Sequence, residues 1–365
     1  MNSKKRVITT LKNKIPDQVP VFATLTPQVA EKLSDDMDIP TKVEDSFLST
    51  RISHTEILLE LGNDAIGIGA GRSFDSPTEK LEDGRLKDEW GIIYKKVGLY
   101  SEAVERPLSY VEKTSDLYDY EFPKAEAEGR FDLAKIQTEK YGDQYAVIAS
   151  VEAFMFELAW NLVGLEKFLL DLAQKKPYII DLLDKLQEYN LNCAKKLINI
   201  GADVIWTGDD FGTQIGMLIS PDLWREVFKP RYKKVYYELK KEKSDIIIAH
   251  HSCGSIFPII EDMIEIGLDV LNPIQPKAKD MDLKKLKQKY GKEIAFFGGI
   301  DIQEILPYGT TKEVEKEVKN KIAIAGKNGG YLLAPAHNIQ PDTSLENIYK
   351  LFESVKKYGK YPLKI

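Results

Sequence analysis

Short apolar runs alternate with longer amphipathic stretches along most of the chain. The stretches at 182–200 and 256–266 carry apolar residues at helical spacing, which predicts helices with one face on a core. The apolar runs are largely continuous, as expected of parallel strands covered on both faces. We expect strands at 19–25, 65–70, 145–151, 204–209, 245–251, 270–275, 294–299 and 330–335.

A short motif recurs at three of the predicted junctions between a helix and a strand. Each copy has an apolar helix end, a glycine, an aspartate two residues later and an apolar run, at 58–68, 197–206 and 263–272. Gly62, Gly201 and Gly267 can adopt the left-handed conformation that ends a helix. Repeated junctions of this kind build parallel βα units. Eight strands with helices between them therefore predict one α/β domain over 1–365, a (β/α)8 TIM barrel.

Residues 71–130 interrupt this alternation of predicted strands and helices. They contain Glu-Asp-Gly-Arg at 82–85, a hairpin signal, and the apolar and aromatic stretch 88–94. We expect an inserted hairpin after the second strand. An insert at this point of a barrel lies on the catalytic face, where it serves as a lid or as an elaborated loop.

Composition and charge narrow the class of protein. The net charge of −6 and the pI near 5.5 argue against a general nucleic-acid binder, which usually has a basic face. No apolar run is long enough for a membrane span or a signal peptide. Two cysteines in 365 residues indicate a reducing compartment, so we expect a cytoplasmic protein without disulfides.

Histidine and cysteine side chains follow two of the predicted strands. His251 and Cys253 are two positions apart at a strand end, so they face the same way. Imidazole and thiolate groups suit zinc, and His337, after the last strand, opens onto the same end of a barrel. These three residues predict a zinc site with its fourth position open. The alternative is a buried cysteine with two hydrogen-bonded histidines.

Other polar residues close the predicted strands on the same face. Asp209 and Asp210 end the fourth strand, and adjacent carboxylates are costly unless they are paired, bound or hydrated. We expect catalytic roles among Asp209, Asp210 and His250, although at least one aspartate could simply cap a turn. Weaker candidates for binding substrate, for which structural roles are equally open, are Glu152, Asn272, Gln275 and Asp301.

Several longer motifs resemble the uroporphyrinogen decarboxylase superfamily. They begin with His-Ser-Cys-Gly-Ser-Ile at 251–256 and end with the segment 329–342, which contains Ala-Pro-Ala-His-Asn. Between them lie Asp-Val-Leu-Asn-Pro-Ile-Gln-Pro at 269–276 and Phe-Phe-Gly-Gly-Ile-Asp at 296–301. The likeness covers nearly the whole chain and implies a (β/α)8 barrel.

The superfamily contains two chemistries, and the sequence is closer to one of them. True uroporphyrinogen decarboxylases have an arginine-rich segment after the first strand, whereas this chain has no arginine between Arg6 and Arg51. A polyanionic porphyrinogen would lose its bidentate partners there. The corrinoid-linked methyltransferase branch has His-x-Cys after strand five and a cysteine after strand eight, which bind zinc. His251 and Cys253 match, and His337 replaces the third ligand.

The resemblance implies zinc-dependent transfer of a methyl group between a corrinoid and a small thiol or methyl donor. No Asp-x-His-x-x-Gly corrinoid motif occurs in the chain, so the corrinoid would arrive on a partner protein. A homodimer is also compatible with the resemblance. The alternative activity is that of a decarboxylase acting on a non-porphyrin acid, with His251 and Asp210 protonating a carbanion. A non-catalytic protein that binds a corrinoid or tetrapyrrole is a third alternative.

Overall fold

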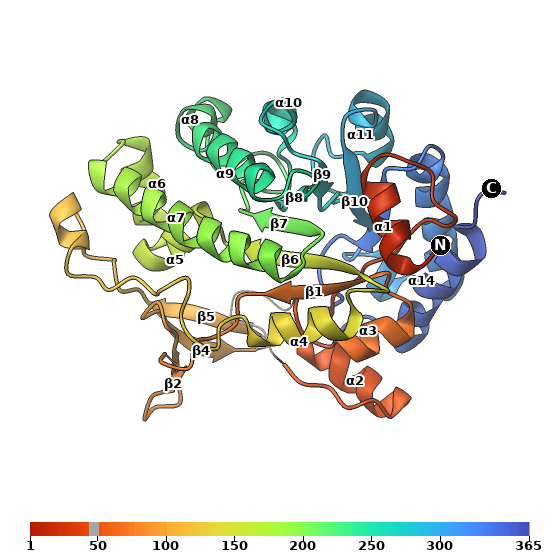
Figure 1. The fold of residues 1–365 in the computed structure, drawn as a ribbon, viewed down its shortest axis with the longest axis horizontal. Helices are drawn as coiled ribbons and strands as arrows, with labels where there is room; N and C mark the ends of the chain where they lie inside the picture. Colours follow the sequence, from red (N-terminus) through yellow and green to blue (C-terminus); the bar gives the residue numbers. More distant parts are fainter. Residues whose placement is uncertain (44–50, 77, 99, 365) are drawn as a thin grey trace.

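The computed structural model describes residues 1–43, 51–76, 78–98 and 100–364. Its central element is a parallel sheet of seven strands in the order β1-β6-β7-β8-β9-β10-β11 (Figure 1). The strands are β1 (Ala65–Gly69), β6 (Ala146–Glu152), β7 (Val204–Gly208), β8 (Ile247–His251), β9 (Val270–Asn272), β10 (Ala295–Ile300) and β11 (Tyr331–Pro335). Seven of the eight expected strands are thereby confirmed.

Helices surround this sheet (Figure 1), the first packing Val7 and Leu11 into the interior core and most of the others lying on the outer face. They are α1 (Ser3–Leu11), α2 (Pro27–Met37), α3 (Thr55–Leu61), η1 (Thr114–Leu117), α4 (Asp132–Tyr141), α5 (Phe156–Val163), α6 (Leu165–Ala173), α7 (Pro177–Ile200), α8 (Pro221–Val227), α9 (Lys229–Glu242), η2 (Phe257–Ile259), α10 (Ile260–Glu265), α11 (Leu283–Tyr290), α12 (Ile305–Tyr308), α13 (Thr311–Lys321), η3 (Ile322–Gly326) and α14 (Leu345–Tyr358). Among the described residues, no helix combines the length and hydropathy needed to cross a membrane.

The sheet curls around an interior core. One cluster of buried side chains draws members from every strand of the sheet, including Ala65 of β1 and Leu332 of β11 at its two ends. Phe22 packs against Trp206 and Phe297, with ring centroids 6.2 and 5.9 Å apart. The two edges of the sheet therefore approach each other across a filled centre, as in a barrel.

The expected first strand, 19–25, is not a regular strand. Val21 and Leu25 form only isolated parallel bridges, to Leu333 within β11 and to Ile339 beyond it. On the other side, Asn63 bonds both the N–H and the carbonyl of Ala23 through its side-chain amide. Toward β1, side-chain bonds thus take the place of part of a backbone ladder, whereas toward β11 the segment bonds to Leu333 and Ile339 through its backbone.

The repeated Gly-x-Asp motif has a structural explanation. The carboxylate of each aspartate accepts a backbone N–H from the neighbouring strand, and its own N–H donates to the carbonyl of that same residue. The pairs are Asp64 with Val21, Asp203 with Val147 and Asp269 with Ile248. Each aspartate therefore fixes the register at the point where a strand begins.

The insertion after β1 is more than the single hairpin that we expected. It forms a four-stranded antiparallel sheet of β2 (Glu79–Lys80), β3 (Leu86–Lys87), β4 (Ile93–Val97) and β5 (Tyr100–Glu105). Gly84, at φ +82°, lies in the turn between β2 and β3. Figure 1 shows this sheet beside the carboxyl end of β1.

Candidate functional site

His251 and Cys253 lie at the carboxyl end of β8 with their side chains together. The Cys253 Sγ is 3.3 Å from the His251 Nε2, and an oxygen of Asp210 is 3.5 Å from the same nitrogen. The three ligand atoms all lie within 4.8 Å of one another. Gly208, the β7 neighbour of His251, leaves room for the imidazole, because a Cβ there would lie 2.9 Å from the His251 Cβ.

Two loops meet by their backbones to place Asp210 beside the thiol. The Asp210 carboxylate accepts the N–H of Cys253 at 2.6 Å. Gly254 has φ +77°, and a Cβ on it would lie 2.5 Å from the carbonyl carbon of Gly212. Both loops therefore need glycine at the point of contact, which explains the Gly after Cys253 and the Gly two residues after Asp210.

Asn272 sets the tautomer of His251. Its side-chain N–H donates to the carbonyl of Phe297 at 3.1 Å, which fixes the orientation of the amide. The amide oxygen then lies 2.6 Å from the His251 Nδ1, so that nitrogen carries the proton. The Nε2 lone pair is left facing Cys253 and Asp210, as in histidines that bind metal ions.

Burial dominates the protonation of this cluster. It lowers the pKa of His251 well below its ordinary value, with the Arg51 charge acting in the same direction. It raises the pKa of the Cys253 thiol, to which the Asp210 charge adds. It also raises the pKa of Asp210, and the pKa of nearby Glu157 lies well above its ordinary value because of burial and then the Asp210 charge. The cluster therefore gathers acceptors that a bound cation would stabilise in their deprotonated forms.

Arg51 and Glu152 form an ion pair next to the imidazole. The Arg51 guanidinium lies 3.9 Å above the indole of Trp206, and one of its nitrogens is 3.2 Å from the His251 Nδ1. The Glu152 carboxylate is 3.8 Å from that same Nδ1. Sequence reasoning missed Arg51 because it follows no strand, and its segment has no periodic pattern.

His337 lies beside the cluster. Its ring centroid is 6.2 Å from that of His251, at an interplanar angle of 68°. Both rings line a cavity of about 10 Å³, together with Arg51 and Asn272, which is room for about one water-sized group. Burial, followed by the Arg51 charge, lowers the pKa of His337 to about 4, so the imidazole is neutral. Its role as a metal ligand stays a prediction.

Comparison with known proteins identifies the family. The profile of the uroporphyrinogen decarboxylase (URO-D) family matches residues 101–358. The chain belongs to this family. The resemblance inferred from the His-x-Cys and later motifs is thereby confirmed.

Relatives within the family include both chemistries. A methylcobamide:CoM methyltransferase, MtaA, from Methanosarcina barkeri is 27% identical over 224 residues, which cover 61% of this chain and 62% of the relative. A uroporphyrinogen decarboxylase from Nostoc punctiforme is 23% identical over 262 residues, 70% of each chain. The match thus spans less than two thirds of the MtaA relative's length.

A solved structure shares the fold. A methyltransferase from Methanosarcina mazei superposes with a TM-score of 0.74 and 22% sequence identity, covering 98% of this chain and 99% of that chain. At this identity the likeness speaks for the architecture alone. It agrees with a curled parallel sheet of the family's barrel type.

Two residues expected to be catalytic lie outside the cluster. His250 is fully buried on the outer side of β8, where its Nδ1 is 3.0 Å from the Thr207 hydroxyl and 3.2 Å from that of Tyr236. Asp209 is also fully buried; its carboxylate accepts two backbone N–H groups at the start of α5 and the Tyr232 hydroxyl. Both side chains point to the outer side of the sheet, because alternate positions at a strand end face opposite sides, and catalytic roles for them stay predictions.

The other predicted residues of the site make mainly structural contacts. The Gln275 side-chain oxygen accepts the N–H of Gly254 at 2.9 Å and so supports the His-x-Cys loop. Asp301 is buried and accepts the N–H of Gln303 at 2.8 Å. Asn272 orients His251, as described above. Roles for these three residues in binding substrate stay predictions, whereas Glu152 borders a pocket.

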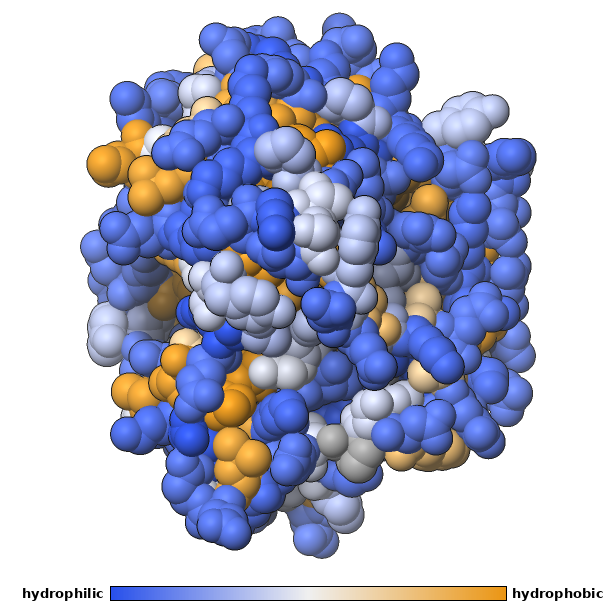
Figure 2. Space-filling view, turned by 90° about the vertical axis from the view of Figure 1, so that its left-hand side faces the viewer, coloured by the Kyte–Doolittle hydropathy of each residue, from blue (hydrophilic) through white to orange (hydrophobic). Residues whose placement is uncertain are grey.

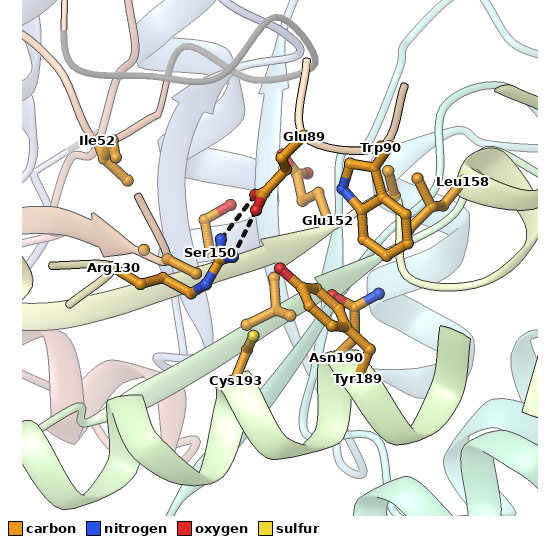
Figure 3. A pocket seen from close by; sticks show the side chains of 14 residues that line it. Ile52, Glu89, Trp90, Arg130, Ser150, Glu152, Leu158, Tyr189, Asn190 and Cys193 are labelled. Carbon is orange, nitrogen blue, oxygen red and sulfur yellow. Dashed lines mark hydrogen bonds and ion pairs between the residues drawn. The ribbon is translucent and has the colours of Figure 1, made fainter. Parts of the chain in front are cut away.

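That pocket, of about 130 Å³, lies between the insertion and the carboxyl ends of β1 and β6 (Figure 3). Its walls come from the strand ends, α5, α7 and the insertion, with Ser150, Glu152, Leu158, Tyr189, Glu89 and Trp90 among the lining residues. The space-filling view in Figure 2 shows the left-hand side of Figure 1, where the insertion lies, with apolar side chains scattered among polar ones. Glu152 connects this pocket to the His251 cluster.

Proposed function

We propose that this protein is a zinc-dependent methyltransferase that moves a methyl group between a corrinoid and a small thiol or methyl donor. One observation carries the proposal. Three donor atoms of different chemical types, from Asp210, His251 and Cys253, converge within 4.8 Å, and the imidazole presents its Nε2 lone pair to the other two. Nitrogen, sulfur and oxygen donors in this number are typical of catalytic zinc, which keeps a further position open.

The residues present fit a zinc ion. His251, Cys253 and Asp210 would bind it, and His337 is the nearest further imidazole. Compared with the set predicted from the sequence, Asp210 joins the proposed ligands and restores a negative charge that a His2Cys site would lack. Bound zinc would act as a Lewis acid that keeps a substrate thiol in its thiolate form.

The chain's own residues have separate tasks around this site. Asn272 orients the His251 imidazole and keeps its Nδ1 protonated. Glu157 accepts the backbone N–H of Asp210 at 3.2 Å, and burial, followed by the Asp210 charge, raises its pKa. The Arg51–Glu152 pair keeps the rim of the site neutral in charge while placing both groups within 4 Å of the imidazole.

The corrinoid would be carried by a partner protein, since this sequence contains no corrinoid-binding motif of the Asp-x-His-x-x-Gly type. The names of the MtaA relatives, methylcobamide:CoM methyltransferases, support a corrinoid as one of the two reactants. The barrel's carboxyl end, where the cluster lies, is the face on which such a partner would dock.

The test combines metal analysis with a reaction. The protein is purified without added zinc, stripped with a chelator and titrated with zinc, and methyl transfer from methylcobalamin to a set of small thiols is followed by the change in corrinoid absorbance. We expect about one zinc per chain and transfer that returns with zinc. Transfer that persists without metal would contradict the proposal. Zinc-independent release of carbon dioxide from an organic acid would favour the decarboxylase alternative instead.

A further inference from the structure

The pocket in Figure 3 adjoins the proposed zinc site through Glu152 and the side of the His251 imidazole that faces away from the proposed metal ligands. Glu152 lines the pocket, and its carboxylate lies 3.8 Å from the His251 Nδ1. The pocket volume of about 130 Å³ suits a small organic molecule. Three features of the lining residues define the kind of molecule.

The first feature is the pairing of charges. Arg130, which is 2% exposed, makes a bidentate ion pair with Glu89, at 2.7 and 2.5 Å. It also donates to the carbonyls of Gly71 and Lys124, which hold the guanidinium in place. The remaining carboxylate, that of Glu152, is paired with Arg51. An ionic ligand would have to break one of these pairs or stay unpaired in a confined space, and both cost free energy.

The second feature is a set of polar groups that face the pocket. The indole N–H of Trp90 and the hydroxyl of Ser150 have no hydrogen-bond partner among the described residues, and both side chains line the cavity. Tyr189 adds a phenol whose ring meets Trp90 edge-on, with centroids 4.8 Å apart. These groups can donate hydrogen bonds to an oxygen or sulfur atom of a ligand.

The third feature is an apolar wall. Ile52, Ala70, Val151 and Leu158 line the same cavity. A ligand with a methyl or methylene end would bury that end against this wall while its polar atom meets Trp90 and Ser150. Binding pockets commonly combine an apolar body with a few convergent polar groups in this way.

We infer that this pocket binds a small uncharged alcohol, thiol or methyl ether, and that this molecule is the non-corrinoid reactant. The assignment of the occupant as a reactant rests on the proposed methyl transfer, whereas the preference for uncharged ligands rests only on the pocket. A thiol with an anionic tail would find no unpaired cation among the described lining residues, since Arg130 is committed to Glu89.

The experiment uses three ethers of similar size that differ in charge. They are 2-methoxyethanol, methoxyacetate and 2-methoxyethylamine, which are uncharged, anionic and cationic at neutral pH. Zinc is removed first, because a carboxylate, hydroxyl or amine could otherwise coordinate it and obscure the comparison. Dissociation constants are measured by ligand-observed NMR on the metal-stripped 365-residue chain. We expect the uncharged ether to bind at least about ten-fold more tightly than either ion.

Variants locate the binding. Ser150→Ala and Trp90→Phe should each weaken binding of 2-methoxyethanol, by up to about ten-fold, because each removes one donor. Matched controls are Ser109→Ala and Trp160→Phe, which alter the same residue types away from this cavity and should leave binding unchanged. The comparison of the three ethers on the unaltered protein decides the question even if a variant fails to fold.

Tighter binding of methoxyacetate would overturn the inference, because it would show that Arg130 is released from Glu89. Tighter binding of 2-methoxyethylamine would overturn it as well and would indicate that the carboxylates recognise a cation. Equal binding of all three ethers would also overturn it, because the paired charges of the pocket would then not discriminate between charged and uncharged ligands. If the uncharged ether binds selectively but no methyl transfer occurs with zinc, the proposed function fails and the ligand preference stands.

Discussion

The two faces of the β7–β8 strand ends carry the same residue types and differ in what those residues do. On the outer face, Asp209 and His250 lie in the core beside Tyr232, whose hydroxyl donates to Asp209 at 2.5 Å. On the inner face, Asp210 and His251 meet Cys253 around the imidazole Nε2, whose lone pair is turned toward the sulfur and the carboxylate.

The two aspartates differ in how many of the hydrogen bonds to their carboxylates the protein itself supplies. Asp209 accepts hydrogen bonds from two backbone N–H groups and a phenol, so its carboxylate is fully used in holding α5 on the sheet. Asp210 accepts one backbone N–H and is otherwise turned toward a thiol and an imidazole. The residue type alone therefore does not identify a functional side chain. Asp210 differs from Asp209 because the protein occupies fewer of its hydrogen-bonding positions, which leaves more of them for a ligand.

The largest expected effect is the difference between substituting His251 and substituting His250. His251→Ala should abolish stoichiometric zinc binding and lower methyl transfer by about a thousand-fold or more, because it removes a metal ligand and the Lewis acid with it. His250→Gln should retain zinc, since His250 faces the outer layer. The measurements are zinc content after gel filtration and the transfer rate. Equal zinc loss in both variants would contradict the distinction between the faces.

Substitutions of the two adjacent aspartates should change different properties of the protein, namely zinc affinity for Asp210 and stability for Asp209. Asp210→Asn should weaken zinc binding by about 100-fold, measured by competition with a chelator, with little change in the unfolding free energy of the metal-free protein. Asp209→Asn should instead lower that unfolding free energy by about 2–4 kcal/mol, because an amide cannot accept all the hydrogen bonds that end on the carboxylate. The interpretation fails if Asp210→Asn is the more destabilising of the two.

Substitutions of Asn272 test whether zinc binding depends on the orientation that Asn272 gives to the His251 imidazole. Asn272→Leu removes the acceptor for the His251 Nδ1–H and should weaken zinc binding by about 10- to 100-fold. Asn272→Asp keeps an acceptor at that position and should weaken it less, although the donor to Phe297 is lost. Isothermal calorimetry of zinc binding compares them. Similar zinc affinities for the Asn272→Leu variant and the wild type would show that orientation is unimportant.

The most gradual effect concerns pH and the outer histidine. Burial lowers the pKa of His250 to about 3, whereas the unfolded chain binds this proton near pH 6.5. Between these values the unfolded state holds more protons, so His250 stabilises the fold fully above about pH 6.5 and loses that contribution as pH falls. The difference in unfolding free energy between wild type and His250→Gln should fall by about 1.4 kcal/mol for each pH unit of acidification in this window. A pH-independent difference would contradict it.

Much of the fold and the centre of the site could be predicted from the sequence. Continuous apolar runs marked seven strands, and strand alternation placed His251 and Cys253 on one side. The same alternation, applied to His250, would have put it on the opposite face. Arg51 could not be predicted, because it follows no predicted strand and reaches the site through the contact of its guanidinium with Trp206. Glu157 was missed because it belongs to a helix rather than to a strand end.

The segment 19–25 is joined to its neighbours by a different set of hydrogen bonds from those that join the regular strands of the sheet. Elsewhere, backbone groups join the strands, and no substitution of a side chain can delete those groups. Here backbone bonds join the segment to Leu333 on the β11 side. On the β1 side, the Asn63 amide bonds to Ala23, and the Asp64 carboxylate and backbone N–H both bond to Val21. The connection of this segment to β1 thus depends in part on two replaceable side chains, so point mutation can weaken this junction more readily than one made by backbone groups alone.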